Sequence, residues 1–186
     1  MSNIFFTSDT HFGHANIIQF CHRPFSSTDE MNEALITNWN SVVQPDDTVY
    51  HLGDFCFGTI NLWEEIRKRL NGHIHLILGN HDMKQVKNQA RMNNLFDSVS
   101  FQQQINLDNR SVYLNHYPFL CYGGTYRREA DAVWQLFGHV HSGPTCKGAD
   151  TDRLANLFKY QLDVGVDNFK YTPVNWDVVK KIIESR

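Results

Sequence analysis

The sequence predicts a layered α/β fold. Short apolar runs recur along the chain, and each ends in a glycine, an acidic residue or a histidine, as buried strands that lead into tight loops do. Between the early runs lie stretches with apolar residues at helical spacing, whereas the later part contains mostly strand-like runs. With 186 residues, of which 41% are hydrophobic, the chain is expected to form a single domain, residues 1–186, with a sizeable core.

The first half is expected to alternate strands with helices. One helix begins at Ser27 or Thr28, whose hydroxyl groups are suited to cap it, and ends before Pro45. A second apolar stripe over residues 60–70 predicts another helix, which the following Gly72 terminates. The strands of this half are expected at residues 4–9, 48–52 and 75–78.

Strands dominate the second half. Residues 83–110 are polar and are expected to form a helix and then a strand near 99–105, before a turn at Asp108 and Asn109. Residues 142–156 are expected to be loop, and a short helix over 178–183 closes the chain. Further strands are expected at residues 111–114, 133–137 and 160–166.

The composition argues against several classes of protein. The formal net charge of −3 provides no basic field, so stable nucleic-acid binding is not expected. The four cysteines form no C-x-x-C pair, which favours neither a zinc knuckle nor a disulfide framework and is typical of thiols in a reducing compartment. The N-terminus does not resemble a signal peptide, and no apolar run approaches the length of a membrane span. We therefore expect a cytoplasmic protein without a membrane partner.

Five apolar runs end in residues that can bind a metal ion. Each is ambiguous by itself, because a Gly-Asp after a strand is usually a turn and a histidine beside an apolar run is more often structural. If the runs are neighbouring strands, however, their C-terminal ends lie at one edge, where α/β proteins bind ligands. In chain order the residues are Asp9 with His11, Asp54, Asn80 with His81, His116, and His139 with His141.

Carboxylates, imidazoles and an amide oxygen form a mixed nitrogen and oxygen ligand set without a thiolate. Such a set suits manganese, iron, zinc or nickel, and it argues against calcium or a structural zinc site. The set is too large for one ion that also binds water, so we expect two divalent ions that share a bridging carboxylate. Together with a bridging hydroxide the centre would carry a charge of about +1, which suits a phosphate ester anion as substrate.

In this order, the motifs Asp-x-His, Gly-Asp, Gly-Asn-His-Asp, a later His and Gly-His-x-His resemble those of the calcineurin-like metallophosphoesterases. They extend from residue 9 to residue 141, and the stretch after the first motif resembles a compact branch of the family found in small single-domain proteins. The resemblance implies a four-layer fold, in which two β-sheets pack as a sandwich with helices outside.

The same resemblance implies a set of ligands for each of two metal ions. The first ion would be held by Asp9, His11, Asp54 and His141. The second would be held by Asp54, as the bridging carboxylate, together with Asn80, His116 and His139. Manganese is the expected metal, with iron, zinc or nickel as alternatives.

Three residues would take part in catalysis if the resemblance holds. Asp54 would bridge the ions, and His81 matches the family histidine that contacts the phosphate and protonates the leaving group. Asp82 matches the acidic neighbour of that histidine and would either orient His81 or cap and shape the loop. Many relatives carry a second acidic residue three positions after the bridging one, where this chain has Phe57, so substrate preference is in doubt more than metal binding.

Four further residues are candidates for substrate binding. His14 and Asn16 would contact a phosphate oxygen or a carboxylate that supports the ligands. Arg23 would pair with phosphate through two hydrogen bonds, or it would be an exposed arginine before a proline. Arg127 follows a double glycine and would belong to a basic loop over the site, or to an ordinary solvated loop.

The function expected from these residues is that of a phosphoesterase with two metal ions, in which a metal-bridging hydroxide attacks phosphorus. Small phosphodiesters or nucleotides are the favoured substrates, because no protein-docking segment is identified. The alternatives are a phosphomonoesterase or protein phosphatase, a nuclease, and a metal-binding scaffold without activity. The residues leave the oligomeric state open.

Overall fold

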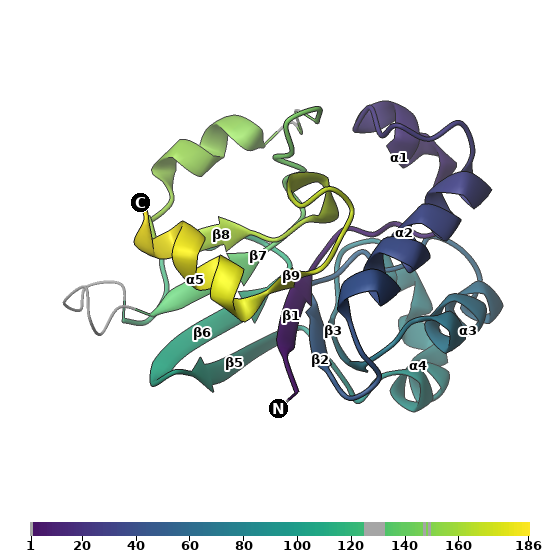
Figure 1. Ribbon diagram of the computed structural model, residues 1–186, viewed down its shortest axis with the longest axis horizontal. Coiled ribbons are helices and arrows are strands. Elements are labelled where there is room, and N and C mark those ends of the chain that lie inside the picture. Colours follow the sequence, from purple (N-terminus) through teal and green to yellow (C-terminus); the bar gives the residue numbers. More distant parts are fainter. Residues whose placement is uncertain (1, 125–132, 147, 149) are drawn as a thin grey trace.

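Two β-sheets face one another in the computed structural model, which describes residues 2–124, 133–146, 148 and 150–186 (Figure 1). The first sheet contains β1 (Ile4–Thr7), β2 (Thr48–His51), β3 (His73–Ile77), β4 (Ser98–Ser100) and β9 (Val174–Asn175). The second contains β5 (Gln102–Leu107), β6 (Arg110–Asn115), β7 (Trp134–Phe137) and β8 (Gln161–Asp163). The α-helices are α1 (Ala15–Phe20), α2 (Thr28–Val42), α3 (Ile60–Arg69), α4 (Gln89–Leu95) and α5 (Trp176–Glu184). The described 3₁₀ helices are η1 (Asp82–Asn88), η3 (Thr151–Asn156) and η4 (Val166–Asn168).

Parallel pairing aligns the strand ends that matter for the site. In the first sheet, with the order β4-β3-β2-β1-β9, strands β1 to β4 run parallel and β9 is antiparallel. In the second sheet, with the order β5-β6-β7-β8, the hairpin β5-β6 is antiparallel, and β6, β7 and β8 are parallel. The C-terminal ends of β1, β2 and β3 therefore share one edge, and those of β6, β7 and β8 share another.

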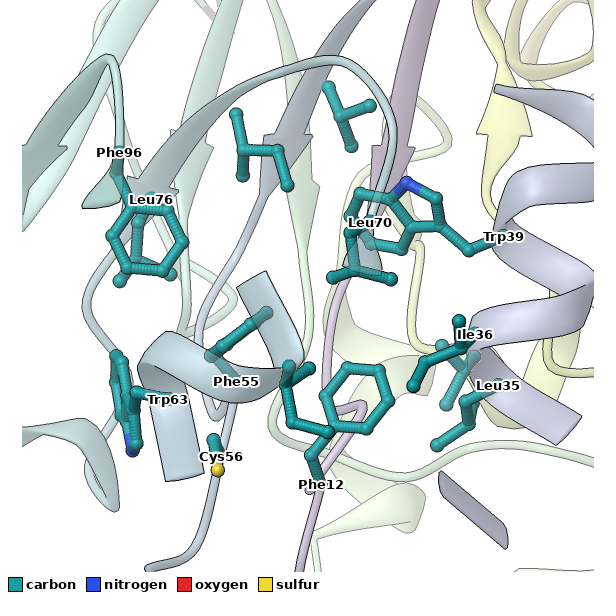
Figure 2. Close-up of a cluster of buried hydrophobic side chains, with 14 of the residues drawn as sticks. Phe12, Leu35, Ile36, Trp39, Phe55, Cys56, Trp63, Leu70, Leu76 and Phe96 are labelled. Atoms are coloured by element: carbon teal, nitrogen blue, oxygen red, sulfur yellow. The ribbon is translucent and has the colours of Figure 1, made fainter. Parts of the chain in front are cut away.

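Alternation along the strands divides the core into two layers. In β1, Phe5 packs with the helices, whereas its neighbour Phe6 packs between the sheets, because successive side chains point to opposite faces. Helices α2, α3 and α4 cover the outer face of the first sheet (Figure 1). The Phe55 ring lies 5.2 Å from Trp63 and 5.3 Å from Phe96 in the layer beneath these helices, which Figure 2 shows in part.

The predicted α/β architecture is confirmed, with two sheets and flanking helices. Helix α2 begins after Ser27, whose Oγ accepts a hydrogen bond from the amide of Glu30 at 3.1 Å. The predicted turn joins β5 to β6 through Asp108 and Asn109, both of which have positive φ, as such hairpin turns require.

Several details differ from the sequence-based expectations. The expected strand 160–166 is a strand only in β8, and Val166 already belongs to η4. Helix α1 and strand β9 were not anticipated, because six and two residues are too few to show a periodicity. The expected loop 142–156 contains the 3₁₀ helix η3. The expected strand near 99–105 is divided at the exposed Phe101, where the chain leaves the first sheet and enters the second.

Among the described residues, no helix has both the length and the apolar character to cross a membrane.

Candidate metal centre

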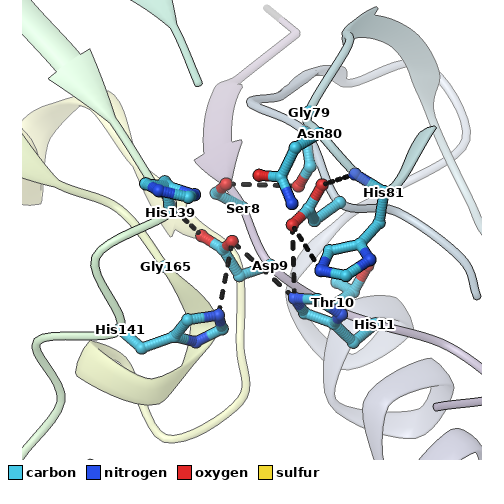
Figure 3. A network of polar contacts seen from close by, with 12 residues as sticks. Ser8, Asp9, Thr10, His11, Gly79, Asn80, His81, His139, His141 and Gly165 are labelled. Atoms are coloured by element: carbon cyan, nitrogen blue, oxygen red, sulfur yellow. Dashed lines mark hydrogen bonds and ion pairs between the residues drawn. The ribbon is translucent and has the colours of Figure 1, made fainter. Parts of the chain in front are cut away.

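The loops that follow five strands meet at one place between the two sheets. Asp9 and His11 follow β1, and Asp54 follows β2. The other loops, after β3, β6 and β7, supply Asn80 with His81, His116, and His139 with His141. Figure 3 shows side chains from the first, third and last of these loops pointing toward one another.

Strained backbone positions mark these loops. Asp9, His11, Asp54, His139 and His141 all have φ between 50° and 69°, a region that residues other than glycine rarely adopt. Each such residue costs on the order of 1–3 kcal/mol and persists only where the surrounding structure enforces it. Such strain is typical of functional sites, because it directs side chains that relaxed loops would turn away.

Asp82 enforces the conformation of two of the loops. Its buried carboxylate accepts hydrogen bonds from the amides of Asp54 at 2.8 Å, Phe55 at 3.0 Å and Gly79 at 2.9 Å. The carboxylate thereby joins the loop after β2 to the loop after β3. Of the two predicted roles for Asp82, these contacts match the shaping of the loop rather than the orientation of the His81 ring.

Asp9, His11 and His141 form the first part of the cluster. Oδ1 of Asp9 lies 3.9 Å from Nε2 of His11 and 3.8 Å from Nε2 of His141. The other carboxylate oxygen of Asp9 accepts a hydrogen bond from the amide of His139 at 2.9 Å, which joins the loops after β1 and β7. His11 Nε2 also lies 3.5 Å from Oδ2 of Asp54, which connects this part of the cluster to the next.

Asp54, Asn80 and His116 form the second part, and His139 lies beside it. Oδ2 of Asp54 is 3.6 Å from Nε2 of His116, and Oδ1 of Asn80 is 3.0 Å from the same nitrogen. The His139 ring lies 5.1 Å from the His116 ring, between centroids. The structure thus brings together all the side chains that were predicted as metal ligands, with Asp54 between the two parts.

Hydrogen bonds behind the histidines direct lone pairs into the cluster. Nδ1 of His116 lies 2.8 Å from the carbonyl oxygen of Leu52, which can only accept, so this nitrogen donates. Nε2 of a neutral His116 is then an acceptor, and it faces two further acceptors on Asn80 and Asp54. The Nδ1 of His141 donates to Asp167 at 3.1 Å, so in the neutral form of His141 Nε2 is the acceptor toward Asp9.

Two buried polar atoms of the cluster have no hydrogen-bond partner among the described residues, namely Oδ1 of Asp9 and Nε2 of His11. Leaving such an atom unsatisfied costs about 1–3 kcal/mol, and more for a charged group. Carboxylate oxygens and imidazole nitrogens that converge without hydrogen-bond partners are the arrangement that a metal cation satisfies. The donor set therefore fits divalent metal ions.

The charges lead to the same conclusion. Burial, together with the nearby carboxylates of Asp9 and Asp82, raises the pKa of Asp54 to about 8. Burial likewise lowers the pKa of His11, His116 and His139, so these imidazoles are neutral, as metal ligands must be. A bound cation would favour the ionised form of Asp54 and offset the repulsion between the carboxylates.

His81 lies at the open side of the cluster. Its amide donates to Oδ1 of Asp54 at 2.9 Å, while its Nε2 is 3.9 Å from Oδ2 of the same residue. About a third of its side chain is exposed, in contrast to the buried His11 and His116. The imidazole can therefore reach both the cluster and a molecule bound above it.

The residues predicted to bind substrate do not lie together in the structure. Nδ1 of His14 lies 3.0 Å from Nδ1 of His11, so this histidine supports a proposed ligand and also faces the opening. Burial, followed by the charge of His81, lowers the pKa of His14 to about 4. Asn16 is exposed on the first turn of α1. Arg127 lies outside the described residues.

Both alternatives predicted for Arg23 are wrong. Its side chain is fully buried, in an ion pair with Asp167 at 2.9 Å. Its remaining donors bind the carbonyl oxygens of Asp9 at 2.7 Å and Thr10 at 3.0 Å. A guanidinium with these contacts is neither exposed nor available to a phosphate group.

Asp167 is a residue of the site that sequence reasoning missed. It lies in η4, after β8, in the run Val164-Gly165-Val166-Asp167. This run resembles Leu52-Gly53-Asp54 after β2, except that one residue separates the glycine from the acidic residue. The adjoining backbone runs beside the loop after β1, since Gly165 and Ser8 form a parallel bridge. The pattern could have identified it.

Cavities lie on two sides of the cluster. One of about 520 Å³ is lined by residues that include His14, Phe57, His81 and Lys84. The other, of about 540 Å³, begins at His139 and Tyr117 and is lined mainly by apolar groups, including Leu154 and Leu157. Both are large enough for a small organic group.

Comparison with known proteins links the site to one family. Residues 2–156 match the calcineurin-like phosphoesterase superfamily domain. An uncharacterized protein of Methanocaldococcus jannaschii is 35% identical over 189 residues, which cover 99% of this chain and 93% of the relative. The Gene 66 protein of Mycobacterium phage L5 is 29% identical over 192 residues, with 90% of this chain and 87% of the phage protein covered. Among solved structures, a protein of unknown function from Aquifex aeolicus superposes with a TM-score of 0.73 at 28% identity, over 98% of this chain and 100% of the other.

Proposed function

The chain belongs to the calcineurin-like phosphoesterase superfamily, and from this premise we propose that it hydrolyses small phosphodiesters at a centre of two divalent metal ions. The observation that carries the proposal is the convergence of buried polar atoms without hydrogen-bond partners among the described residues, in particular Oδ1 of Asp9 and Nε2 of His11, beside Asp54. Membership of the superfamily supports a hydrolase of phosphoric esters, and the metal-binding geometry supports dependence on divalent cations.

The proposed ligands form two sets, one for each ion, and these sets correspond to the two parts of the cluster. Asp9, His11 and His141 would hold one ion, Asn80, His116 and His139 the other, and Asp54 would contact both. The chemistry that divalent ions supply in such a site is the activation of water and the polarisation of phosphoryl oxygens. Manganese is the proposed metal, with iron, zinc or nickel as alternatives, because the ligands are imidazole and oxygen donors.

His81 is the proposed general acid. Its ring is partly exposed beside the cluster, where it would reach the oxygen that departs from phosphorus and donate a proton to it. Nζ of Lys84 lies 4.8 Å from the centre of the Phe57 ring in the same cavity, and its positive charge would favour an anionic substrate there.

The two cavities favour a diester over a monoester. A phosphodiester carries an organic group on each of two ester oxygens, whereas a monoester carries one. The cavity beside His81 would receive the leaving group against the Phe57 ring, which stacks on His14 with 4.2 Å between ring centroids. The cavity beside His139 would receive the second group against Leu154 and Leu157. Nucleotides and related small diesters have groups of this size.

The test compares bis(p-nitrophenyl) phosphate with p-nitrophenyl phosphate as substrates of chelated protein resupplied with Mn²⁺, Ni²⁺, Zn²⁺ or Mg²⁺. Metal-dependent release from the diester, with little from the monoester, is the expected result. Release from the monoester alone would replace the proposal with a phosphomonoesterase. No turnover despite two bound ions per chain would indicate a scaffold without activity.

A matched pair of variants tests the second cavity. Leu157→Trp fills part of the cavity beside His139, so it should raise KM for bis(p-nitrophenyl) phosphate, whose second group is large. The KM for methyl p-nitrophenyl phosphate, whose second group is only a methyl, should be unchanged. Val178→Trp, at an exposed position on α5, is the control and should change neither value. Equal effects of Leu157→Trp on both diesters would exclude this cavity as the second binding site.

A further inference from the structure

Two cysteines from distant parts of the chain meet beside the candidate metal centre. Cys21 follows α1, and Cys146 lies in the segment after β7. Both are almost completely buried, at 1% and 3% exposure. Their sulfur atoms and one imidazole nitrogen of His141 all lie within 4.8 Å of one another.

Hydrogen bonds hold the two cysteines in place. The hydroxyl of Thr145 donates to the carbonyl oxygen of Cys21 at 3.1 Å, which ties the segment after β7 to the end of α1. The amide of Cys21 donates to Ile17 at 2.9 Å, and the amide of Cys146 donates to Gly143 at 3.1 Å. These backbone and side-chain hydrogen bonds therefore fix the positions of the two thiols relative to each other.

We propose that Cys21, Cys146 and His141 form a further binding site, which shares His141 with the candidate metal centre, for a thiophilic divalent cation such as zinc or cadmium. In a tetrahedral zinc site with bonds of about 2.3 Å to sulfur, two sulfur atoms lie about 3.8 Å apart. To reach such a geometry, the two sulfur atoms need to approach by no more than about 1 Å, and the nitrogen and each sulfur by no more than about 1.3 Å. Two thiolates and a neutral imidazole around a divalent ion form an uncharged unit, which suits a buried position.

The cation has a route to this site. Both cysteines and His141 line the cavity of about 520 Å³ that also contains His81. A fourth coordination position could therefore be filled by water from the cavity. The remaining cysteines are elsewhere in the molecule, with Cys56 buried in the layer beneath the helices and Cys121 exposed.

The two sets of ligands differ in the cations they prefer. Thiolates select soft or borderline ions such as Cd²⁺ and Zn²⁺, whereas carboxylate, amide and imidazole ligands also accept Mn²⁺. His141 belongs to both sets, so a thiophilic ion would draw this imidazole away from the centre that includes Asp9. We therefore expect cadmium to inhibit the manganese-loaded protein. This expected inhibition rests on the proposed function, whereas the binding site itself does not.

The test is titration of the full, reduced protein with Cd²⁺ after loading with Mn²⁺, followed by the ultraviolet absorption that arises from thiolate–cadmium charge transfer. One equivalent should produce the band in the wild-type protein. Because loss of an outer partner alone costs about 10–100-fold in metal affinity, loss of a direct thiolate in Cys21→Ser or Cys146→Ser should weaken binding by at least about 100-fold. Cys121→Ser is the matched control and should bind as the wild type does.

Two results of the titration would overturn the proposal: no charge-transfer band in the wild type, or a band that persists unchanged in both serine variants. X-ray absorption of the cadmium-bound wild type provides a measurement that needs no variant, and it should give two sulfur neighbours and at least one nitrogen. A shell without sulfur would also overturn the proposal. These readouts record binding alone, so they hold even if the phosphoesterase assignment fails.

Discussion

Arg23 and Asp167 form a buried ion pair with two hydrogen bonds, of 2.9 and 3.0 Å, although they are 144 residues apart in the chain. The same guanidinium binds the carbonyl oxygens of Asp9 and Thr10, and Asp167 accepts a hydrogen bond from Nδ1 of His141. One ion pair thus joins the loop that carries Asp9 to His141. We infer that it positions the proposed ligands without touching the metal or the substrate.

Asp167→Asn tests this role. The substitution leaves the Arg23 charge buried without its counter-ion, which typically costs about 3–5 kcal/mol of stability. It also weakens the hydrogen bond that orients His141, so the affinity for one of two Mn²⁺ ions should fall by about 10–100-fold. Urea unfolding and Mn²⁺ titration measure the two effects.

The control for Asp167→Asn is Glu33→Gln, which removes an exposed ion pair with Arg69. Solvent screens that pair, so neither stability nor Mn²⁺ binding should change measurably. If Asp167→Asn behaved like the control, the ion pair would have no part in positioning the ligands.

Part of the fold and site could be predicted because the signals are local. Each proposed ligand stands within a few residues of an apolar run, so the strand and its loop are visible in one stretch of sequence, as at His116 after β6. Parallel pairing of the strands then places the loops together. The pattern of strand, glycine and polar residue can therefore be recognised without knowing which distant residues it contacts.

The rest depends on pairing across the chain. Nothing near Arg23 indicates that its partner is Asp167, so its burial could not be foreseen from a preceding apolar segment and a following proline. The contact between Cys21 and Cys146 is equally remote, and it depends on α1, which is too short for a periodicity. Asp82 presented two possible roles in the sequence, and the three amides that it binds become visible only in the structure.

Asp54→Asn should abolish binding of the proposed pair of metal ions. Its carboxylate lies between the two parts of the cluster, 3.5 Å from His11 and 3.6 Å from His116, and an amide supplies no negative charge for the cations. Metal analysis after dialysis should find fewer than two ions per chain, and diester hydrolysis should be lost. Retention of both ions would exclude Asp54 as the bridge.

His81→Ala should retain both ions and lose activity selectively. Removal of a general acid slows esters with poor leaving groups by about 10²–10⁴-fold, whereas nitrophenyl esters need less protonation and should be slowed much less. The comparison of kcat for alkyl and nitrophenyl diesters measures this selectivity. His75→Ala, which alters a histidine of β3 that bonds to Ser98, is the control. Equal slowing of both classes of ester would contradict a general-acid role.

Gly79→Ala should weaken metal binding through steric collision alone, because the substitution removes no polar or charged group. A Cβ at this position would collide with the carboxylate and the amide of Asp54, so the side chain at the centre of the cluster would have to move. Overpacking of this kind costs about 1–3 kcal/mol of stability, and we expect Mn²⁺ affinity to fall with it. Gly123→Ala is the matched control, since its Cβ would meet only the Tyr113 hydroxyl at 3.7 Å. Unchanged Mn²⁺ binding in Gly79→Ala would show that Asp54 has room to adjust.

Stability should depend on pH through His51. Burial lowers the pKa of this histidine to about 3, from about 6.5 in an unfolded chain. Its ring accepts a hydrogen bond from the amide of Gly53 and contacts the Thr10 hydroxyl, so the folded state holds it neutral. Below about pH 6.5 the unfolded chain binds a proton that the folded chain does not, so His51 should lower stability by up to about 1.4 kcal/mol per pH unit down to about pH 3.

The variant His51→Gln isolates this contribution from those of the other buried histidines. Glutamine retains a donor and an acceptor but does not titrate, so the variant should lose less stability on acidification than the wild type. Urea unfolding of chelated protein between pH 7 and pH 5 measures the difference in slope. His22→Gln, at an exposed position, should keep the wild-type slope. If His51→Gln kept it too, protonation of His51 would have no part in acid destabilisation.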